Sequence, residues 1–339
     1  MSGKWVTAVL AVMVMLSAKA ASAGVLDEVK ERGSLRCAVT RSGIGVAETD
    51  QAGRWIGFFP EFCRVIAASV LGDKDAVEFV ELEFKDGFLA VRSGQADVFM
   101  TNTTWTLKRD AGMGLHFSHT LLYDGQGFMA HRSLAASSAQ DLPAASVCVL
   151  GNTTTEANLD DFAAKRNPRL KPMKFNALLG VFDAFFSRRC DVLTADRIEL
   201  VSQRLSRASK PEDYVIIPGL ISKEPLGPVV RDDDPRWFSA VRWSTYATIA
   251  AEEKGINAAN VEAMKASTDP EVRRLLGVDA GMGRELELDD GWALRAIKQV
   301  GNYGEIFDRT LGMGSPHKLD RGVNALWTNG GLMIAPPVR

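Results

Sequence analysis

The sequence predicts an α/β fold in which two similarly built lobes are joined by a hinge. Strand-like and helix-like segments alternate from residue 34 to residue 196, which is typical of a sheet with parallel strands. A spaced pattern of residues occurs once in each half of the chain. Two extended segments, residues 121–133 and 214–234, connect the halves, so the chain is expected to leave the first lobe and later return to it.

The elements of the first half follow from its periodicity. Residues 34–40 alternate apolar and polar side chains, as a strand with one apolar face does. Apolar residues between Phe62 and Val70 recur at helical spacing, and Gly72 then ends the predicted helix. The remaining predicted elements of this half are a strand at 77–84, a short helix at 88–94 and a strand at 96–100.

The second half repeats this order of elements. Its predicted elements are a strand at 145–150, helices at 154–166 and 178–189, and a strand at 190–196. The spaced pattern Phe88, Ala90, Ser93, Asp97 is matched at the same intervals by Phe182, Ala184, Ser187, Asp191. Five residues after each Asp stands another polar residue, Asn102 or Asp196. Because ligands of open α/β sheets bind beyond the carboxyl ends of strands, we expect both residues at ligand-binding edges.

Length and composition are those of an ordinary globular protein. The 339 residues are enough for two cores, and from Pro235 onward the sequence is mainly helical before an extended tail at 331–339. A formal net charge of −2 and the absence of a basic run give no support for nucleic-acid binding or for a membrane-surface patch.

Residues 1–23 have the build of a secretory signal peptide. Lys4 precedes an apolar run from Trp5 to Leu16, and small residues follow as far as Ala23. We expect cleavage after Ala23 and export of the mature chain; the alternative is an uncleaved anchor, for which the apolar run is short. No cysteine follows the cleavage site, so a lipid anchor is not supported.

The cysteine count fits an oxidising compartment. Four cysteines allow three pairings, and proximity along the chain favours Cys37–Cys63 and Cys148–Cys190, one disulfide in each half. Four buried free thiols are the alternative. No metal-ligating set is complete around His116 and His119, and motifs for a nucleophilic serine or a phosphate-binding loop are missing, so neither a metal nor a cofactor is expected.

The tripeptide Asn-Thr-Thr occurs twice, at 102–104 and 152–154, each time after an apolar strand-like run. It is formally a glycosylation sequon, but both copies also stand where a strand gives way to a helix, which suits anion binding. After the first copy, Arg109 could hold a carboxylate with a bidentate fork. The alternative is that Thr104 or Thr106 merely caps a helix while Arg109 is solvated.

The second copy opens the helix at 154–166, and Thr155 is the expected cap of that helix. Asp196, at the end of the last strand of this lobe, is an acceptor suited to an ammonium group. One lobe would therefore offer a cation and hydrogen-bond donors, and the other a carboxylate. A zwitterion fits between them.

Several motifs resemble one family of transport proteins. They include GSLRCAV, FCRVIAASVLGD, NTTWTLKRD, YDGQGFM, ISKEPLGP, IKQVGNYGEIF and VNALWTNGGLMIAPPVR, spread over nearly the whole mature chain. The sequence is similar to the periplasmic solute-binding proteins of polar amino-acid ABC transporters, in particular the general L-amino-acid-binding branch. The resemblance implies a type II clamshell with two crossover strands at the hinge and a helical C-terminal extension. The implied divisions are a signal peptide at 1–23, lobe 1 at 24–126, lobe 2 at 127–221, and the return to lobe 1 with the extension at 222–339.

The resemblance also implies roles for particular residues. Arg109 would hold the α-carboxylate of a free L-amino acid, with first-lobe contacts from Asn102 and Thr104. Thr154, with Thr153 beside it, would contact the carboxylate from the second lobe, and Asp196 would bind the α-ammonium. Phe58 matches an aromatic that packs on the ligand side chain. The implied partner is an inner-membrane ABC permease, and we expect a monomer.

The sequence departs from the family pattern at three places. Asn152 stands where a glycine is usual, Val46 is nearest to an expected aromatic, and Phe59 replaces a usual Asp. Asn tolerates left-handed geometry, so the turn at Asn152 is expected to survive. The alternative function is a periplasmic dehydratase-like enzyme on the same scaffold, for which Glu48 is the remaining candidate acid.

Overall fold

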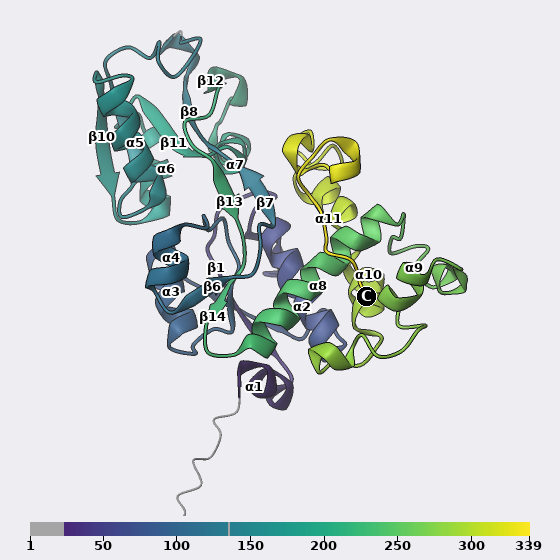
Figure 1. Ribbon diagram of the computed structural model, residues 1–339. Helices are drawn as coiled ribbons and strands as arrows, with labels where there is room; N and C mark the ends of the chain where they lie inside the picture. The colour runs from purple at the N-terminus through teal and green to yellow at the C-terminus, as the bar shows by residue number, and fades with distance from the viewer. Residues whose placement is uncertain (1–23, 135) are drawn as a thin grey trace, which may run out of the picture.

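The protein consists of two α/β lobes and a helical C-terminal segment that packs on the first lobe (Figure 1). The computed structural model describes residues 24–134 and 136–339. The predicted signal peptide lies outside the described residues. Within them, none of the helices is both long and apolar enough to cross a membrane.

The first lobe is built on a five-stranded sheet in the order β4-β1-β5-β14-β6. β1 is parallel to β4 and β5, whereas β14 is antiparallel to β5 and β6. Its strands are β1 (Leu35–Val39), β4 (Val77–Glu81), β5 (Val98–Phe99), β6 (Leu115–Phe117) and β14 (Val229–Arg231), with a small hairpin of β2 (Glu48–Thr49) and β3 (Trp55–Ile56). Its helices are α1 (Val25–Arg32), α2 (Phe58–Leu71), α3 (Phe84–Arg92) and α4 (Leu107–Gly112).

Alternating side chains of this sheet bury both of its faces, because successive residues of a strand point to opposite sides. Ala38 and Phe99 face the cluster around α3. Cys37 and Val39 belong to the larger core that contains α2 and the C-terminal helices. The predicted strand at 77–84 is too long: β4 ends at Glu81, and the residues that follow it open α3.

The second lobe has a similar sheet in the order β10-β9-β11-β8-β12. β9 is parallel to β10 and β11, and β8 is antiparallel to β11 and β12. The elements are β8 (Gln126–His131), β9 (Ala145–Leu150), β10 (Leu170–Phe175), β11 (Val192–Asp196), β12 (Tyr214–Ile217), α5 (Thr154–Lys165), α6 (Leu178–Phe186) and α7 (Arg197–Arg207), with 3-10 turns at Arg132–Leu134 and Pro211–Asp213. One face packs with Leu159 of α5 and the other with α6 and Leu200 of α7.

Two crossing strands connect the lobes, as expected. β7 (Leu122–Asp124) pairs antiparallel with β13 (Glu224–Leu226), with Asp124 opposite Glu224. This two-stranded ribbon lies between the two sheets in Figure 1. The predicted clamshell with two crossover strands is therefore confirmed.

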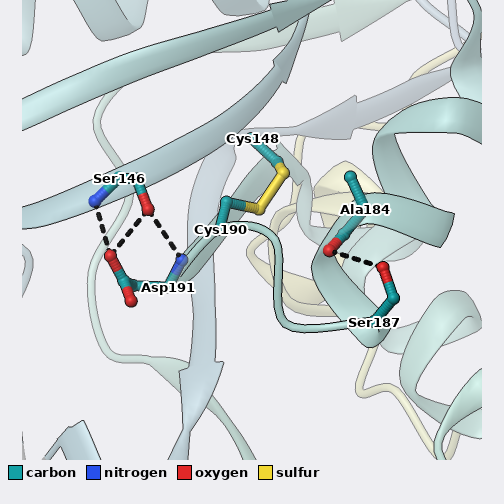
Figure 2. Close-up of a disulfide and its surroundings, with 6 residues drawn as sticks. All are labelled: Ser146, Cys148, Ala184, Ser187, Cys190 and Asp191. Carbon is teal, nitrogen blue, oxygen red and sulfur yellow. Dashed lines mark hydrogen bonds between the residues drawn. A yellow bond between two sulfur atoms is a disulfide. The ribbon is translucent and has the colours of Figure 1, made fainter.

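The repeated sequence pattern has a repeated structural role. In the first lobe the Asp97 carboxylate accepts a hydrogen bond from the Arg36 backbone N–H of β1, 2.7 Å. In the second lobe the Asp191 carboxylate accepts one from the Ser146 backbone N–H of β9, 2.8 Å (Figure 2). The two serines of the pattern each donate to the carbonyl three residues before them, at 3.2 Å in both lobes.

Both predicted disulfides are confirmed. Cys37–Cys63 ties β1 to α2, and Cys148–Cys190 ties β9 to the residues that lead into β11 (Figure 2). The bridges close loops with sequence separations of 26 and 42 residues. In the chain-entropy picture each stabilises the folded state by about 3–4 kcal/mol.

The C-terminal segment begins at a well-capped helix, α8. The Asp234 carboxylate accepts the backbone N–H groups of Arg236 and Trp237, and Pro235 occupies the first turn, where its missing N–H costs nothing. α10 packs against α2 and α8, and the Tyr303 hydroxyl of α11 donates to the Leu121 carbonyl beside the hinge. The helices are α8 (Pro235–Glu253), α9 (Pro270–Leu275), α10 (Trp292–Val300) and α11 (Tyr303–Thr310), with 3-10 turns at Ala263–Ala266, Arg284–Leu286, Gly322–Asn324 and Trp327–Asn329.

Candidate functional site: the cleft between the lobes

A cavity between the two lobes is lined from both sides. The first lobe contributes Phe84, Asn102 and Thr104. The second lobe contributes Leu150, Thr153, Thr154, Thr155, Leu178, Val181, Phe182, Thr194, Ala195, Asp196 and Glu199. One part of this lining is therefore polar, with hydroxyl, amide and carboxyl groups, and the other part is aliphatic and aromatic.

The two polar residues that follow the repeated pattern meet in this cavity. Asp196 ends β11 and directly precedes α7, and it is buried. Asn102 follows β5 in the other lobe and donates its side-chain N–H to the Asp196 carboxylate, 2.9 Å. Burial raises the pKa of Asp196 well above its usual range, and the neighbouring carboxyl group of Asp124 adds to this shift.

Threonines of the two Asn-Thr-Thr tripeptides also lie close to one another. The hydroxyl oxygens of Thr104 and Thr154 are 3.3 Å apart across the cleft. Thr153 is the cap of α5, since its hydroxyl accepts the Glu156 N–H and donates to the Leu150 carbonyl. The expectation that Thr155 caps this helix is therefore wrong, because the cap stands two residues earlier.

Arg109 is held in the first lobe close to the cavity. One guanidinium N–H donates to the Thr104 carbonyl, 2.9 Å, and the guanidinium carbon lies 5.3 Å from the ring centre of Phe84 and 5.2 Å from that of Phe88. Arg109 is not itself among the lining residues, but it contacts two residues that are.

The Arg109 side chain is also largely withdrawn from solvent. Only 9% of Arg109 is exposed, and this burial lowers the pKa of its guanidinium, an effect that the charges of Glu224 and Asp196 oppose. The alternative with a solvated Arg109 is wrong, although Thr106 does cap α4. A buried guanidinium beside a cavity is suited to hold an anionic group.

The aromatic residue at the cavity is not the one expected. Phe58 is fully buried in the first-lobe core, where its ring packs against Phe62, Tyr303 and Phe307. The cavity is instead lined by Phe84. Phe84 could have been identified from its place shortly after a strand end. It was missed because the predicted strand at 77–84 was too long and included it.

Glu224 was also missed by sequence reasoning, although it lies in the motif ISKEPLGP. It stands on hinge strand β13, only 2% exposed. Its carboxylate accepts hydrogen bonds from the hydroxyls of Thr104 and Ser222 and from the Asn158 amide, the last at 2.9 Å. Glu224 therefore connects both lobes to the hinge and contributes a negative charge near Arg109.

The turn at Asn152 has the left-handed geometry that the sequence predicts, with φ 59°. We expect Asn152→Ala to destabilise the fold by about 1 kcal/mol, because the left-handed backbone conformation costs more free energy for alanine than for asparagine. Asn152→Gly should leave stability equal or higher. Urea unfolding of the three proteins measures the difference. Equal destabilisation by Ala and Gly would show that the amide side chain, and not the backbone conformation, matters.

The described residues contain no cluster of His, Cys, Asp and Glu that could hold a metal ion. His116 is on β6 and points to solvent, whereas His119 is buried beside Tyr246. Burial and the charge of Arg242 lower the pKa of His119 to about 3, so it is neutral. The two histidines therefore do not form a shared site.

A comparison of sequences agrees with the fold. The pattern of the bacterial extracellular solute-binding proteins, family 3, matches residues 35–273. The chain belongs to this family. It is 45% identical to the general L-amino acid-binding periplasmic protein AapJ of Rhizobium johnstonii, over 98% of each chain. It is 46% identical to the glutamate/glutamine/aspartate/asparagine-binding protein BztA of Rhodobacter capsulatus, over 96% of this chain and 97% of the relative.

This solute-binding protein also has a solved structural relative. A periplasmic binding protein of an ABC transporter from Brucella ovis, with glutathione bound, superposes with a TM-score of 0.91 at 44% identity. The match covers 94% of this chain and all of the other. The described relatives are binding proteins, and their likeness to this chain extends through the helical C-terminal segment.

Proposed function

We propose that the protein captures a free L-amino acid between its lobes in the periplasm and delivers it to an inner-membrane ABC permease. The observation that carries this proposal is that a basic group and an acidic group lie at one cleft on opposite lobes. A buried guanidinium, Arg109, lies on the first lobe, and a buried carboxyl group, Asp196, lies on the second. The family and the names of the relatives AapJ and BztA support the same reading.

In this proposal Arg109 holds the α-carboxylate. One of its N–H groups is used by the Thr104 carbonyl, which leaves the other donors of the guanidinium for the ligand. The hydroxyls of Thr104 and Thr154 face one another across the cleft, and a carboxylate between them would receive a donor from each lobe. Thr153, which caps α5, positions Thr154 at the start of that helix.

Asp196 binds the α-ammonium in this proposal. It now accepts a hydrogen bond from Asn102, and a ligand ammonium would supply the stronger, charge-assisted donor. Asn102 would then contact the ligand from the first lobe. Because residues from both lobes contribute to one ligand, binding energy favours the closed arrangement of the clamshell.

A dehydratase-like activity has less support. Glu48, the acid considered for it, lies on the short strand β2 and is not among the residues that line the cavity. We propose that the protein is not an enzyme, needs no cofactor, and binds its ligand as a monomer. Two carboxylic acids line the cavity: Asp196, assigned above to the α-ammonium, and Glu199, which is better explained as a binding group, as argued below.

A thermal-shift screen of the exported protein against the twenty L-amino acids tests this function. At a ligand concentration of about 100 times Kd, binding should stabilise the folded state by about 2.7 kcal/mol and raise the melting temperature by a few degrees. The D-enantiomers are the matched controls, because they present the same groups in the wrong arrangement. If none of the L-amino acids raises the melting temperature, the proposed ligand class is wrong.

A further inference from the structure

Glu199 stands out among the acidic residues of the cleft. It lies on the first turn of α7, three residues after Asp196, so the two side chains are neighbours on one side of the helix. Only 4% of Glu199 is exposed, and it lines the cavity between the lobes. A buried carboxyl group in such a place requires partners, because burial without them is costly.

The other acidic groups around the cleft have partners within the protein. Asp124 accepts the Ile198 N–H at the start of α7, 3.0 Å, and Asp196 accepts Asn102. Glu224 accepts three side-chain donors. Glu199 differs: its Oε1 atom is buried and has no hydrogen-bond partner within the described part of the chain.

Carboxyl groups outnumber buried cations beside the cleft. Four of them, those of Asp124, Asp196, Glu199 and Glu224, influence one another there, and Arg109 is the buried guanidinium beside them. A zwitterionic amino acid brings a single cation, which Asp196 binds in the proposed function. A ligand with a second positive charge would bring a partner for the ionised form of another of these carboxyl groups.

We propose that Glu199 is a specificity-determining residue that binds the positively charged side-chain group of a basic amino acid such as lysine or arginine. This inference rests on the function proposed above, in which Arg109 and Asp196 hold the groups common to all amino acids. The apolar lining formed by Leu178, Val181 and Phe182 would cover the aliphatic stem of the ligand, as such stems pack on apolar surface while the charged end finds its partner.

The ionisation of Glu199 is consistent with this role. Burial raises the pKa of Glu199 to about 8, with a further contribution from the charge of Asp124, while the Asn102 amide acts in the opposite direction. Below pH 8 the empty site therefore holds a proton. A bound ammonium or guanidinium favours the carboxylate, so binding of a basic ligand must release that proton, and its affinity should rise between pH 6 and pH 8.

The other charged groups that face Glu199 act in known directions. The negative charge of Asp124 on β7 favours the protonated form of Glu199. Asp196 and Glu199 disfavour each other's ionised form, whereas Glu224 on β13 and Arg109 on α4 act on Asp196. The side-chain ammonium of lysine stays charged throughout this pH range. Norleucine has no such group, so its affinity should lack the part of the pH dependence that is due to Glu199 and keep only the part due to Asp196, which is common to all amino acids.

Calorimetry of lysine and norleucine binding tests the proposal, since norleucine keeps the apolar stem of lysine and lacks its ammonium. The wild-type protein should prefer lysine. Glu199→Gln keeps the size of the side chain and should weaken lysine binding by about 10- to 100-fold, the fold-change typical of a hydrogen bond to a charged group, while it changes norleucine binding far less. Glu31→Gln, at an exposed position of α1, is the matched control and should behave as wild type.

Each remaining outcome counts against the proposal in its own way. Equal losses for both ligands in Glu199→Gln would assign Glu199 to the common ammonium and overturn its role in specificity. A wild-type protein that binds norleucine or glutamate as tightly as lysine would also overturn it, while the proposed amino-acid function would stand. Binding of none of these ligands or of the other amino acids would contradict the proposed function itself. As a second readout, lysine binding at pH 7 should release fewer protons from Glu199→Gln than from the wild-type protein, because only the contribution of Asp196 remains.

Discussion

Replacing Arg109 with Ala is expected to weaken binding of the captured amino acid by about 2–5 kcal/mol, roughly 30-fold to several thousandfold. The reason is the burial of this site. A carboxylate that enters the cleft leaves water, and without the guanidinium it would lose its charge-assisted partner. Arg109→Lys keeps the charge but not the fork of donors and should recover only part of the affinity. Isothermal titration calorimetry measures all three proteins.

The control for this prediction must separate binding from folding, because Arg109 also packs beside the rings of Phe84 and Phe88. Arg92→Ala removes an exposed arginine from the end of α3 and should leave affinity unchanged. The melting temperature of the ligand-free Arg109→Ala protein shows whether the fold is intact. A folded Arg109→Ala protein with wild-type affinity would remove Arg109 from the ligand site.

Trp237→Ala is expected to lower the free energy of unfolding by about 3–5 kcal/mol, as for other fully buried large side chains. Trp237 lies in the first turns of α8, is completely buried, and donates its indole N–H to the Asp97 carbonyl, 2.8 Å. Its loss would leave a cavity where the returning chain packs on the first lobe and would remove the partner of a buried carbonyl. Chemical unfolding followed by tryptophan fluorescence and circular dichroism measures the change.

Trp327 offers the matched comparison for this stability prediction. It is a tryptophan of the same C-terminal segment but is 54% exposed, so Trp327→Ala should cost less than about 1 kcal/mol. Similar losses for the two variants would mean that the C-terminal segment unfolds separately from the lobe on which Trp237 packs. The prediction would then fail, because the burial of Trp237 would not contribute to global stability.

Much of the architecture could be predicted from local patterns. The alternation of strands and helices and the two extended segments that cross between the lobes can be recognised from residues close together in sequence. The repeated Asp97 and Asp191 can be recognised because the same spaced pattern occurs once in each half. The disulfide pairing was also predictable, because each lobe contains one pair of cysteines and short loops close more readily than long ones. These features needed no knowledge of how the lobes face one another.

Other features could not be obtained in this way, or were predicted wrongly. Strand β10 was not predicted, since lysines and Pro172 interrupt its apolar pattern and only its edge position in the sheet allows the proline. Phe58 was placed at the ligand and Phe84 within a strand. Aromatic residues follow strands at both places, and which ring turns into the core depends on packing with helices such as α11, which are distant in sequence.

By itself, the sequence determined that Asn102 and Asp196 stand in matching positions at or just after a strand end and that Arg109 follows the first Asn-Thr-Thr tripeptide. Only the tertiary structure decided that Asn102 and Asp196 meet across one cleft and that Arg109 is buried beside it. Among the described residues, it also left the Oε1 atom of Glu199 without a hydrogen-bond partner. The physical reason is that strand and helix periodicity is a local property, whereas burial, charge balance and hydrogen-bond satisfaction depend on which distant segments the hinge brings together.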